Sequence, residues 1–129
     1  MPAGDAFTAF QRHELEKVIA EAERLSGRHF AVHVGPSDGD SRAKAEALHA
    51  RMPDPATSIL VHVDPAQRVL EIVTGADVRT TLTNRQAAFA AINMQSAFAT
   101  GDLERGIRAG VQQLAEFARR QKSLHTDTP

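Results

Sequence analysis

The spacing of the apolar residues changes from helical to alternating and back to helical along this chain, and that order limits the folds it can adopt. In residues 8–26 the apolar side chains recur every three or four positions, which predicts a helix with one apolar stripe. Thr8 and Gln11 have the residue types of a capping box at its start, and Gly27 suits its end. Such a helix must pack against other elements, and the segments that follow it supply them.

Three short segments, 29–34, 58–63 and 69–74, have the apolar pattern of strands. A helix predicted over residues 41–52 separates the first two, so these strands should run parallel through a right-handed crossover. Residues 64–67 (DPAQ) have the chemistry of a type I turn, which predicts an antiparallel hairpin between the second and third strands. The sequence therefore predicts an α/β fold with a small mixed β-sheet, a parallel βαβ crossover plus an antiparallel hairpin.

The chain from Gly75 to about residue 120 has helical spacing in two segments. Thr83 and Gln86 form a second capping-box pattern at the start of the first segment, and Gly101 suits its end. Asp102 is expected to cap the second segment. Two further helices should therefore follow the hairpin.

Gly106 and Gly110 lie four residues apart on the apolar face of the last predicted helix. Glycine costs a helix about 1 kcal/mol relative to alanine, so two such residues need a compensating role. The role we expect is close approach of another backbone. We therefore predict that both are structural glycines, together with Gly75 and Gly101.

The composition restricts the classes of partner and location. The 129 residues suit one domain, which we expect to span 1–120, with a flexible C-terminal tail over 121–129. Lys and Arg total 15 against 16 for Asp and Glu, so no net field attracts nucleic acid or anionic lipid. Cysteine is absent, which excludes disulfides and thiolate chemistry. No signal-like or membrane-spanning run is present, so we expect a soluble, cytoplasmic protein without membrane insertion.

Four segments of the chain resemble one known family when they are taken in order. They are residues 58–64 (SILVHVD), 68–75 (RVLEIVTG), 82–84 (LTN) and 98–107 (FATGDLERGI). Together they resemble the TPM domain, whose members have an apolar strand, a short turn, a second strand ending in glycine, an "L-T-D" helix start and a glycine-acid signature before the final helix. The resemblance covers roughly residues 14–117 and is closest to short actinobacterial members of unknown function.

The TPM resemblance implies a compact α/β sandwich with a mixed sheet and helices on both faces. It also implies several roles, because some TPM relatives are linked to acid phosphatase activity with divalent cations, some to photosystem repair, and others are membrane-tethered. Two departures weaken any inherited cation binding. Gly75 is followed by Ala76, Asp77, Val78 and Arg79 where the family often has a second glycine and a glutamate. The aspartate of the family's "L-T-D" is Asn84 here.

Acidic residues should gather at both ends of the predicted sheet. The loop with Asp38 and Asp40 follows one of two parallel strands and the turn at Asp64 follows the other, so all three should lie at the carboxyl end, where ligands of open α/β sheets bind. Three carboxylates with loop carbonyls could hold Ca²⁺ or Mg²⁺, the one cofactor that the sequence suggests. The alternative is ordinary loop, cap and turn chemistry, which is the favoured interpretation. Asp54 and Asp77 should meet at the opposite end and bind a cation weakly at most.

Histidines are the other candidates for metal binding. His33 and His62 lie on neighbouring strands and could approach to metal-binding distance if they share a face, but no third ligand is evident. His29 and His49 suit a strand end and a helix surface. We therefore expect a structural or solvent-facing role for the strand pair. Nucleophilic catalysis has no motif, because none of the serines lies in a G-x-S-x-G elbow.

The helix predicted over residues 84–100 is apolar around most of its circumference, and Phe89 stands within its remaining polar arc. The other helices of the chain could cover so broad an apolar arc. Alternatively, a partner protein or a second copy of the chain could cover it at Phe89. Cover by the other helices is the favoured interpretation.

Two function hypotheses follow from the sequence. The first is a non-catalytic binding or assembly module that contacts an unknown protein or itself. The second, from the TPM resemblance alone, is a weak divalent-metal-dependent acid phosphatase.

Overall fold

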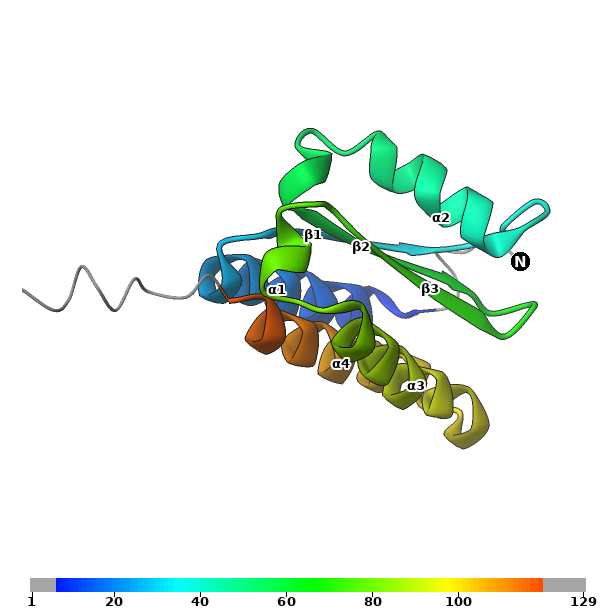
Figure 1. Ribbon diagram of the computed structural model, residues 1–129. Helices are drawn as coiled ribbons and strands as arrows, with labels where there is room; N and C mark the ends of the chain where they lie inside the picture. The colour runs from blue at the N-terminus through cyan, green and yellow to red at the C-terminus, as the bar shows by residue number, and fades with distance from the viewer. Residues whose placement is uncertain (1–6, 120–129) are drawn as a thin grey trace, which may run out of the picture.

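The computed structural model describes residues 7–119, and Figure 1 shows how its elements are arranged. The expected tail at 121–129 lies outside the described residues. Within them the elements, in chain order, are α1 (Ala9–Ser26), β1 (His29–Val34), α2 (Ser41–Ala50), η2 (Pro55–Thr57), β2 (Ser58–Asp64), β3 (Val69–Thr74), η3 (Val78–Thr80), α3 (Asn84–Thr100) and α4 (Leu103–Ala118).

The strands form one mixed sheet in the order β1-β2-β3, as the sequence predicts. β1 and β2 are parallel, with His33 opposite His62, and α2 makes the crossover between them. β2 and β3 are antiparallel, and the turn between them is closed by an Asp64 side-chain oxygen that accepts the Gln67 N–H at 3.2 Å. β1 and β3 are the outer strands of this sheet, and each has one edge that pairs with no other strand within residues 7–119.

Helices cover both faces of the sheet, which confirms the predicted architecture. α2 lies alone on one face, while α1, α4 and α3 lie on the other (Figure 1). The larger core lies between the sheet and these three helices and includes Phe30, Ile59, Val61, Val63, Met94, Ile107, Val111 and Leu114. The smaller core lies beneath α2 and consists of Ala45, Leu60 and Val73. Alternation along each strand divides the side chains between these two cores.

The helix boundaries follow the local sequence closely, with one exception. The capping boxes at Thr8 and Thr83 both form, and the glycines after α1 and α3 adopt left-handed φ angles of 72° and 77°. Asp102 occupies the N-cap position of α4, but within the described residues its carboxylate accepts no capping hydrogen bond. That carboxylate instead lies 3.8 Å from the Arg105 guanidinium, one turn into the helix. Asp102 therefore lies at the predicted N-cap position, but the prediction that its side chain caps α4 is wrong. Its ψ of 60° differs from the extended ψ of 165° and 160° at Thr8 and Thr83, whose side chains do cap.

Three glycines lie where a side chain would collide with a neighbour. A Cβ at Gly106 would stand 2.3 Å from the Ala97 Cβ, and one at Gly110 would stand 2.1 Å from the Met94 Cγ, so α4 packs directly on α3. A Cβ at Gly75 would lie 2.0 Å from the carbonyl oxygen of Pro55.

Candidate functional site

The aspartates expected to bind a cation lie at one end of the sheet but do not converge. Asp38 and Asp40 are exposed in the loop after β1, and Asp40 caps α2 by accepting the Ala43 N–H at 3.3 Å. Asp64 is buried at the end of β2, where its other carboxylate oxygen accepts the Ser37 N–H at 2.9 Å. Among residues 7–119, no three His, Cys, Asp or Glu side chains come together in a group that could hold a metal ion.

The Asp64 carboxylate is satisfied by the chain around it. Burial raises the pKa of Asp64, but hydrogen bonds from the Ser37 side chain and from backbone N–H groups of Gln67, Ser37 and Ala66 outweigh this and leave the pKa below its ordinary value. The group therefore remains a carboxylate near neutral pH. Its function in the structure is to join the loop after β1 to the β2–β3 turn.

His33, His62 and Ser37 form a chain of hydrogen bonds beneath α2, which we call the His–His–Ser chain. The Nδ1 atoms of His33 and His62 are 2.9 Å apart, and the His62 Nε2 lies 3.0 Å from the Ser37 Oγ. His62 is 0% exposed and Ser37 only 3%, whereas His33 is partly exposed. The serine hydroxyl can donate to His62 or accept from it, so the chain can run in either direction with both rings neutral.

Burial is the main reason that both imidazoles resist protonation. It lowers the pKa of His33, and the charges of His62 and Lys44 lower it further. Burial also lowers the pKa of His62, and the neighbouring carboxylates of Asp64 and Glu71 raise it only in part. A Ser–His hydrogen bond is the first half of a nucleophilic triad, but here the hydroxyl is enclosed and a second histidine stands where an orienting carboxylate would be.

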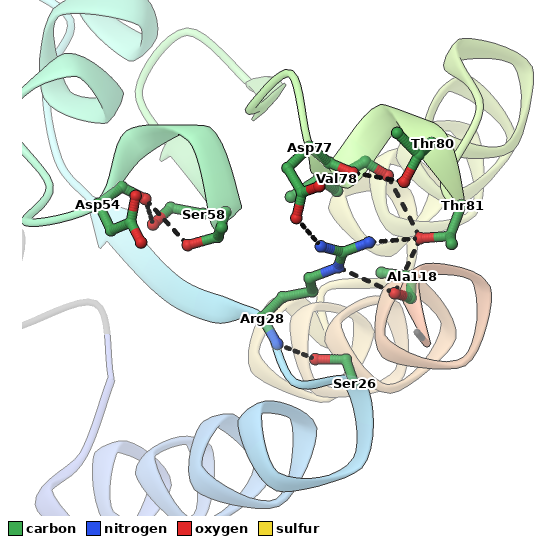
Figure 2. Close-up of polar contacts among 10 residues, drawn as sticks. Ser26, Arg28, Asp54, Ser58, Asp77, Val78, Thr80, Thr81 and Ala118 are labelled. Carbon is green, nitrogen blue, oxygen red and sulfur yellow. Dashed lines mark hydrogen bonds and ion pairs between the residues drawn. The ribbon is translucent and has the colours of Figure 1, made fainter. Parts of the chain in front are cut away.

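The opposite end of the sheet holds a buried arginine that the sequence pattern did not single out. Arg28 is 2% exposed and lies between the end of α1 and the start of β1. Its Nε donates to the Ala118 carbonyl at 3.1 Å, its Nη2 to the Thr81 hydroxyl at 2.9 Å, and its Nη1 pairs with Asp77 at 2.5 Å (Figure 2). Asp54 also lies at this end, where its main-chain carbonyl accepts from the Ser58 hydroxyl, but it does not meet Asp77 as predicted, because Asp77 points to Arg28 instead (Figure 2). Asp77 is thus the partner of a cation that belongs to the chain itself.

A groove of about 460 Å³ runs along the outer edge of β3, and we call it the β3 groove. α2 and α3 form its two walls, and η3 contributes one residue. The lining residues are Arg42, Glu46, Ile72, Val73, Thr74, Arg79, Asn84, Ala87, Ala88 and Ala91. Since these residues lie up to 49 positions apart, no local motif in the sequence could indicate the groove.

Two arginines cover carbonyl groups along the floor of the β3 groove. Arg42 donates from Nη1 to the carbonyl oxygen of Ile72 at 2.8 Å, and Arg79 donates to that of Thr74. Arg42 also lies 3.3 Å from the carboxylate of Glu46 and 3.6 Å from that of Glu71. Both arginine residues are exposed, so their guanidinium groups can exchange these acceptors for others.

Two large apolar side chains of α3 are exposed outside the lining of the β3 groove. Phe89 is 53% exposed, and Ile92, which the sequence pattern assigned to the apolar arc, is 67% exposed. Ile92 follows the groove residue Ala88 by four positions, so the two lie on adjacent turns of the same helix face. Phe89 precedes Ile92 by three positions, so the exposed side of α3 runs from Ala88 through Ile92 to Phe89. We call this exposed side together with the groove the α3–β3 surface.

These features define a small α/β domain with a mixed sheet, a closed polar chain beneath α2 and an open groove at its β3 edge. The chain belongs to the family described as "Domain of unknown function (DUF5130)", whose model matches residues 2–115. No helix within residues 7–119 has the length and apolar character needed to cross a membrane.

Two similar proteins come from Mycobacterium tuberculosis and are called Uncharacterized protein MT2543 and Uncharacterized protein Rv2468c. Each is 27% identical over 101 residues, which cover 78% of this chain. The chain spans 60% of the length of these curated relatives.

Solved structures share the fold at low sequence identity. BA42 protein from the psychrophilic bacterium Bizionia argentinensis matches with a TM-score of 0.77 at 16% identity, over 87% of this chain and 81% of that one. The N-terminal domain of a protein from P. gingivalis matches with a TM-score of 0.72 at 17% identity, over 86% and 75%. The N-terminal domain of cg2496 protein from Corynebacterium glutamicum matches with a TM-score of 0.69 at 14% identity, over 91% and 78%.

Proposed function

We propose that this domain is a non-catalytic binding module whose contact surface is the α3–β3 surface. The observation that carries the proposal is the edge of β3 at the floor of a groove that continues onto exposed Ile92 and Phe89. Exposed apolar side chains beside a groove are typical of surfaces that bind other proteins. Isolated exposed apolar residues are common, and it is their continuity with the groove that favours binding here.

The TPM resemblance also favours a binding module over a metal-dependent enzyme. We propose that the domain is TPM-like, and the two positions where that resemblance leads us to expect carboxylates are Arg79 and Asn84. Both line the β3 groove. Replacement of carboxylates by a cation and an amide makes the groove suited to anionic groups and unsuited to a divalent ion.

The alternative function, a divalent-metal-dependent acid phosphatase, has less support from the geometry. Phosphate-ester hydrolysis needs an accessible nucleophile and strong compensation for developing negative charge. Ser37 is enclosed, and the Asp64 carboxylate already accepts several hydrogen bonds from the chain.

Site-specific photo-crosslinking tests the binding proposal. A benzophenone amino acid would replace Ile92 in one sample and Ala20, an exposed residue of α1, in the control. We expect a discrete adduct in cells from position 92, reduced at least fivefold by Phe89→Glu, and no matching adduct from position 20. Equal adduct patterns from the two positions, or none from position 92, would overturn the proposal.

A further inference from the structure

We propose that the β3 groove binds an extended acidic peptide segment, which adds to the sheet as a strand beside β3. This inference rests on the proposed function and specifies the chemistry of the partner. In such binding the main-chain hydrogen bonds supply affinity, and alternate side chains supply specificity.

The hydrogen-bonding pattern of the hairpin leaves part of β3 directed into the groove. Gly75, just after β3, donates its N–H to the Ser58 carbonyl at 3.0 Å, which fixes the odd-numbered residues as those that face β2. The peptide groups of Ile72 and Thr74 therefore point away from β2. Their N–H groups have no strand partner among the described elements, and their carbonyls are the ones that Arg42 and Arg79 cover.

The walls of the β3 groove leave room for an added strand. The α3 wall consists of Asn84 and three alanines, at 87, 88 and 91, which have the smallest side chains that a helix favours. The α2 wall consists of Arg42 and Glu46. Small residues on one side and long, movable ones on the other suit a ligand that enters along the strand edge.

The charged side chains in the β3 groove favour an acidic partner. Two arginines line the groove against one lining carboxylate, Glu46. Arg42 already lies beside the carboxylates of Glu46 and Glu71, whereas Arg79 is in no ion pair within residues 7–119 and is the cation left for a partner. The carbonyls that the arginines cover are two residues apart, about 7 Å along a strand, which is also the repeat between alternate side chains of an added strand. On binding, each guanidinium would exchange a carbonyl for a carboxylate, which is the stronger acceptor. A second copy of this chain is disfavoured, because its own Arg42 and Arg79 would meet the same two cations.

A competing interpretation gives the arginines the opposite role. Exposed sheet edges are often blocked by charged side chains that prevent unwanted pairing. If Arg42 and Arg79 only block the edge, their removal should strengthen strand addition. If they bind the partner, their removal should weaken it. The sign of the change separates the two interpretations.

The test is a titration of the ¹⁵N-labelled chain, followed by NMR, with a capped heptapeptide of alternating valine and glutamate. We expect saturable shifts of the Ile72 and Thr74 amides. We also expect at least tenfold weaker binding of a peptide with lysine in place of glutamate, and loss of binding when alternate peptide nitrogens are methylated. The double variant Arg42→Gln/Arg79→Gln should bind at least tenfold more weakly, and Arg79→Gln alone should lie between it and the wild type.

The matched control is Arg24→Gln/Arg105→Gln, which removes two exposed arginines from α1 and α4 and should leave the affinity within twofold. Unchanged amide spectra away from the groove would show that each variant is folded. Tighter binding or pairing by the Arg42/Arg79 double variant, equal binding of the lysine peptide, or no shift at Ile72 and Thr74 would overturn the strand proposal. A specific adduct from position 92 alongside such a result would leave the proposed function standing.

Discussion

The rings of His33 and His62 face each other from paired positions of the parallel strands β1 and β2, with their Nδ1 atoms 2.9 Å apart. At that distance one nitrogen must donate and the other accept, so the pair tolerates at most one added proton. Lys44, on α2 above the pair, adds a positive charge that opposes protonation, while Asp64 and Glu71 favour it. Protonation of this pair at low pH should therefore lower the stability of the fold.

The first prediction is a loss of stability in mild acid. Because the pKa values of His33 and His62 are lowered in the folded state, the unfolded chain binds more protons below the ordinary histidine value of 6.5. The free energy of unfolding should then be constant above about pH 7 and fall as the pH drops below 6.5. It should fall by at most about 1.4 kcal/mol per pH unit for each proton that the unfolded chain binds in excess.

Urea denaturation between pH 7.5 and 5 measures this loss. His62→Gln should flatten the profile, whereas His13→Gln, at an exposed position of α1, should keep the wild-type slope. A profile with the same slope in His62→Gln as in the wild type would show that the pair does not cause it.

The second prediction concerns Arg28, whose guanidinium joins the end of α4 to η3. Arg28→Met leaves the Ala118 carbonyl and the Thr81 hydroxyl without this charged donor, and each such hydrogen bond contributes about 1.5 to 3 kcal/mol. We expect a loss of about 3 kcal/mol or more in urea denaturation. Asp77→Asn should cost less than Arg28→Met, because the Asp77 side chain is 41% exposed and asparagine keeps a carbonyl oxygen that can accept from Arg28. Equal losses in the two variants would show that the ion pair, not the two neutral acceptors, explains the role of Arg28.

The third prediction separates the two glycines of α4. Leucine at either position should destabilise the fold by about 1 to 3 kcal/mol or more through overpacking. Alanine should distinguish them, because the Gly106 neighbour is the rigid Cβ of Ala97, whereas the Gly110 neighbour is the flexible side chain of Met94. Gly106→Ala should therefore cost more than Gly110→Ala.

Thermal melting of both alanine variants, with Ala97→Gly/Gly106→Ala as the test of cause, checks this. The double variant removes the colliding Cβ and should regain stability beyond the sum of its two single changes. Additive losses would mean that the collision at Ala97 is not the source of the cost.

The sequence predicted the elements better than the sites, and particular residues show why. The strand pairing followed from apolar periodicity and from the turn at 64–67, which are local signals. The close packing of Gly106 against α3 could also be predicted. Two glycines on the apolar face of a helix lower its stability, so their presence indicates that another element packs closely there. By contrast, Arg28 binds groups at positions 77, 81 and 118, and no short pattern joins those positions. The β3 groove could not be predicted from the sequence either, because its lining residues come from four separate elements.

The candidate cation site shows how local backbone donors compete with a ligand. Topology placed the loop of Asp38 and Asp40 near Asp64, and the structure keeps them at that end of the sheet. The cap and turn chemistry that the sequence favoured is confirmed, because Asp40 accepts the Ala43 N–H and Asp64 accepts the Gln67 N–H. The sequence could not show the third contact, in which Ser37 donates to Asp64 from 27 positions away. These hydrogen bonds occupy both oxygens of Asp64 and one oxygen of Asp40, which a cation would need.

The fourth prediction concerns Phe89 and separates folding from association. Because Phe89 is 53% exposed, Phe89→Glu should change the free energy of unfolding by no more than about 0.5 kcal/mol. If the chain self-associates through α3, the same change should abolish the dimer in light scattering, while Glu16→Gln, on α1, should leave it intact. A wild-type monomer at high concentration would exclude self-association through Phe89 and leave a different protein as the partner.

The last prediction tests the alternative function directly. Hydrolysis of a phosphomonoester requires a nucleophile that reaches the phosphorus and positive charge at the developing anion. Ser37 is 3% exposed and hydrogen-bonded to His62, while the arginines of the β3 groove lie at the outer edge of β3, where the hydroxyl-bearing Thr74 is itself buried. The purified chain should therefore show no turnover above background with Ca²⁺, Mg²⁺ or Mn²⁺, and no large rise in melting temperature with any of them.

The matched variant for this assay is Asp38→Asn/Asp40→Asn/Asp64→Asn, which removes the three carboxylates at the carboxyl end of the sheet together. Its expected activity is the same background value, with a lower stability because Asp64 accepts hydrogen bonds from Ser37 and Gln67. Metal-dependent turnover in the wild type that disappears in the triple variant would overturn the binding-module proposal. Such a result would require the loop after β1 to rearrange, because Asp38 and Asp40 would have to turn toward Asp64 to share a cation with it.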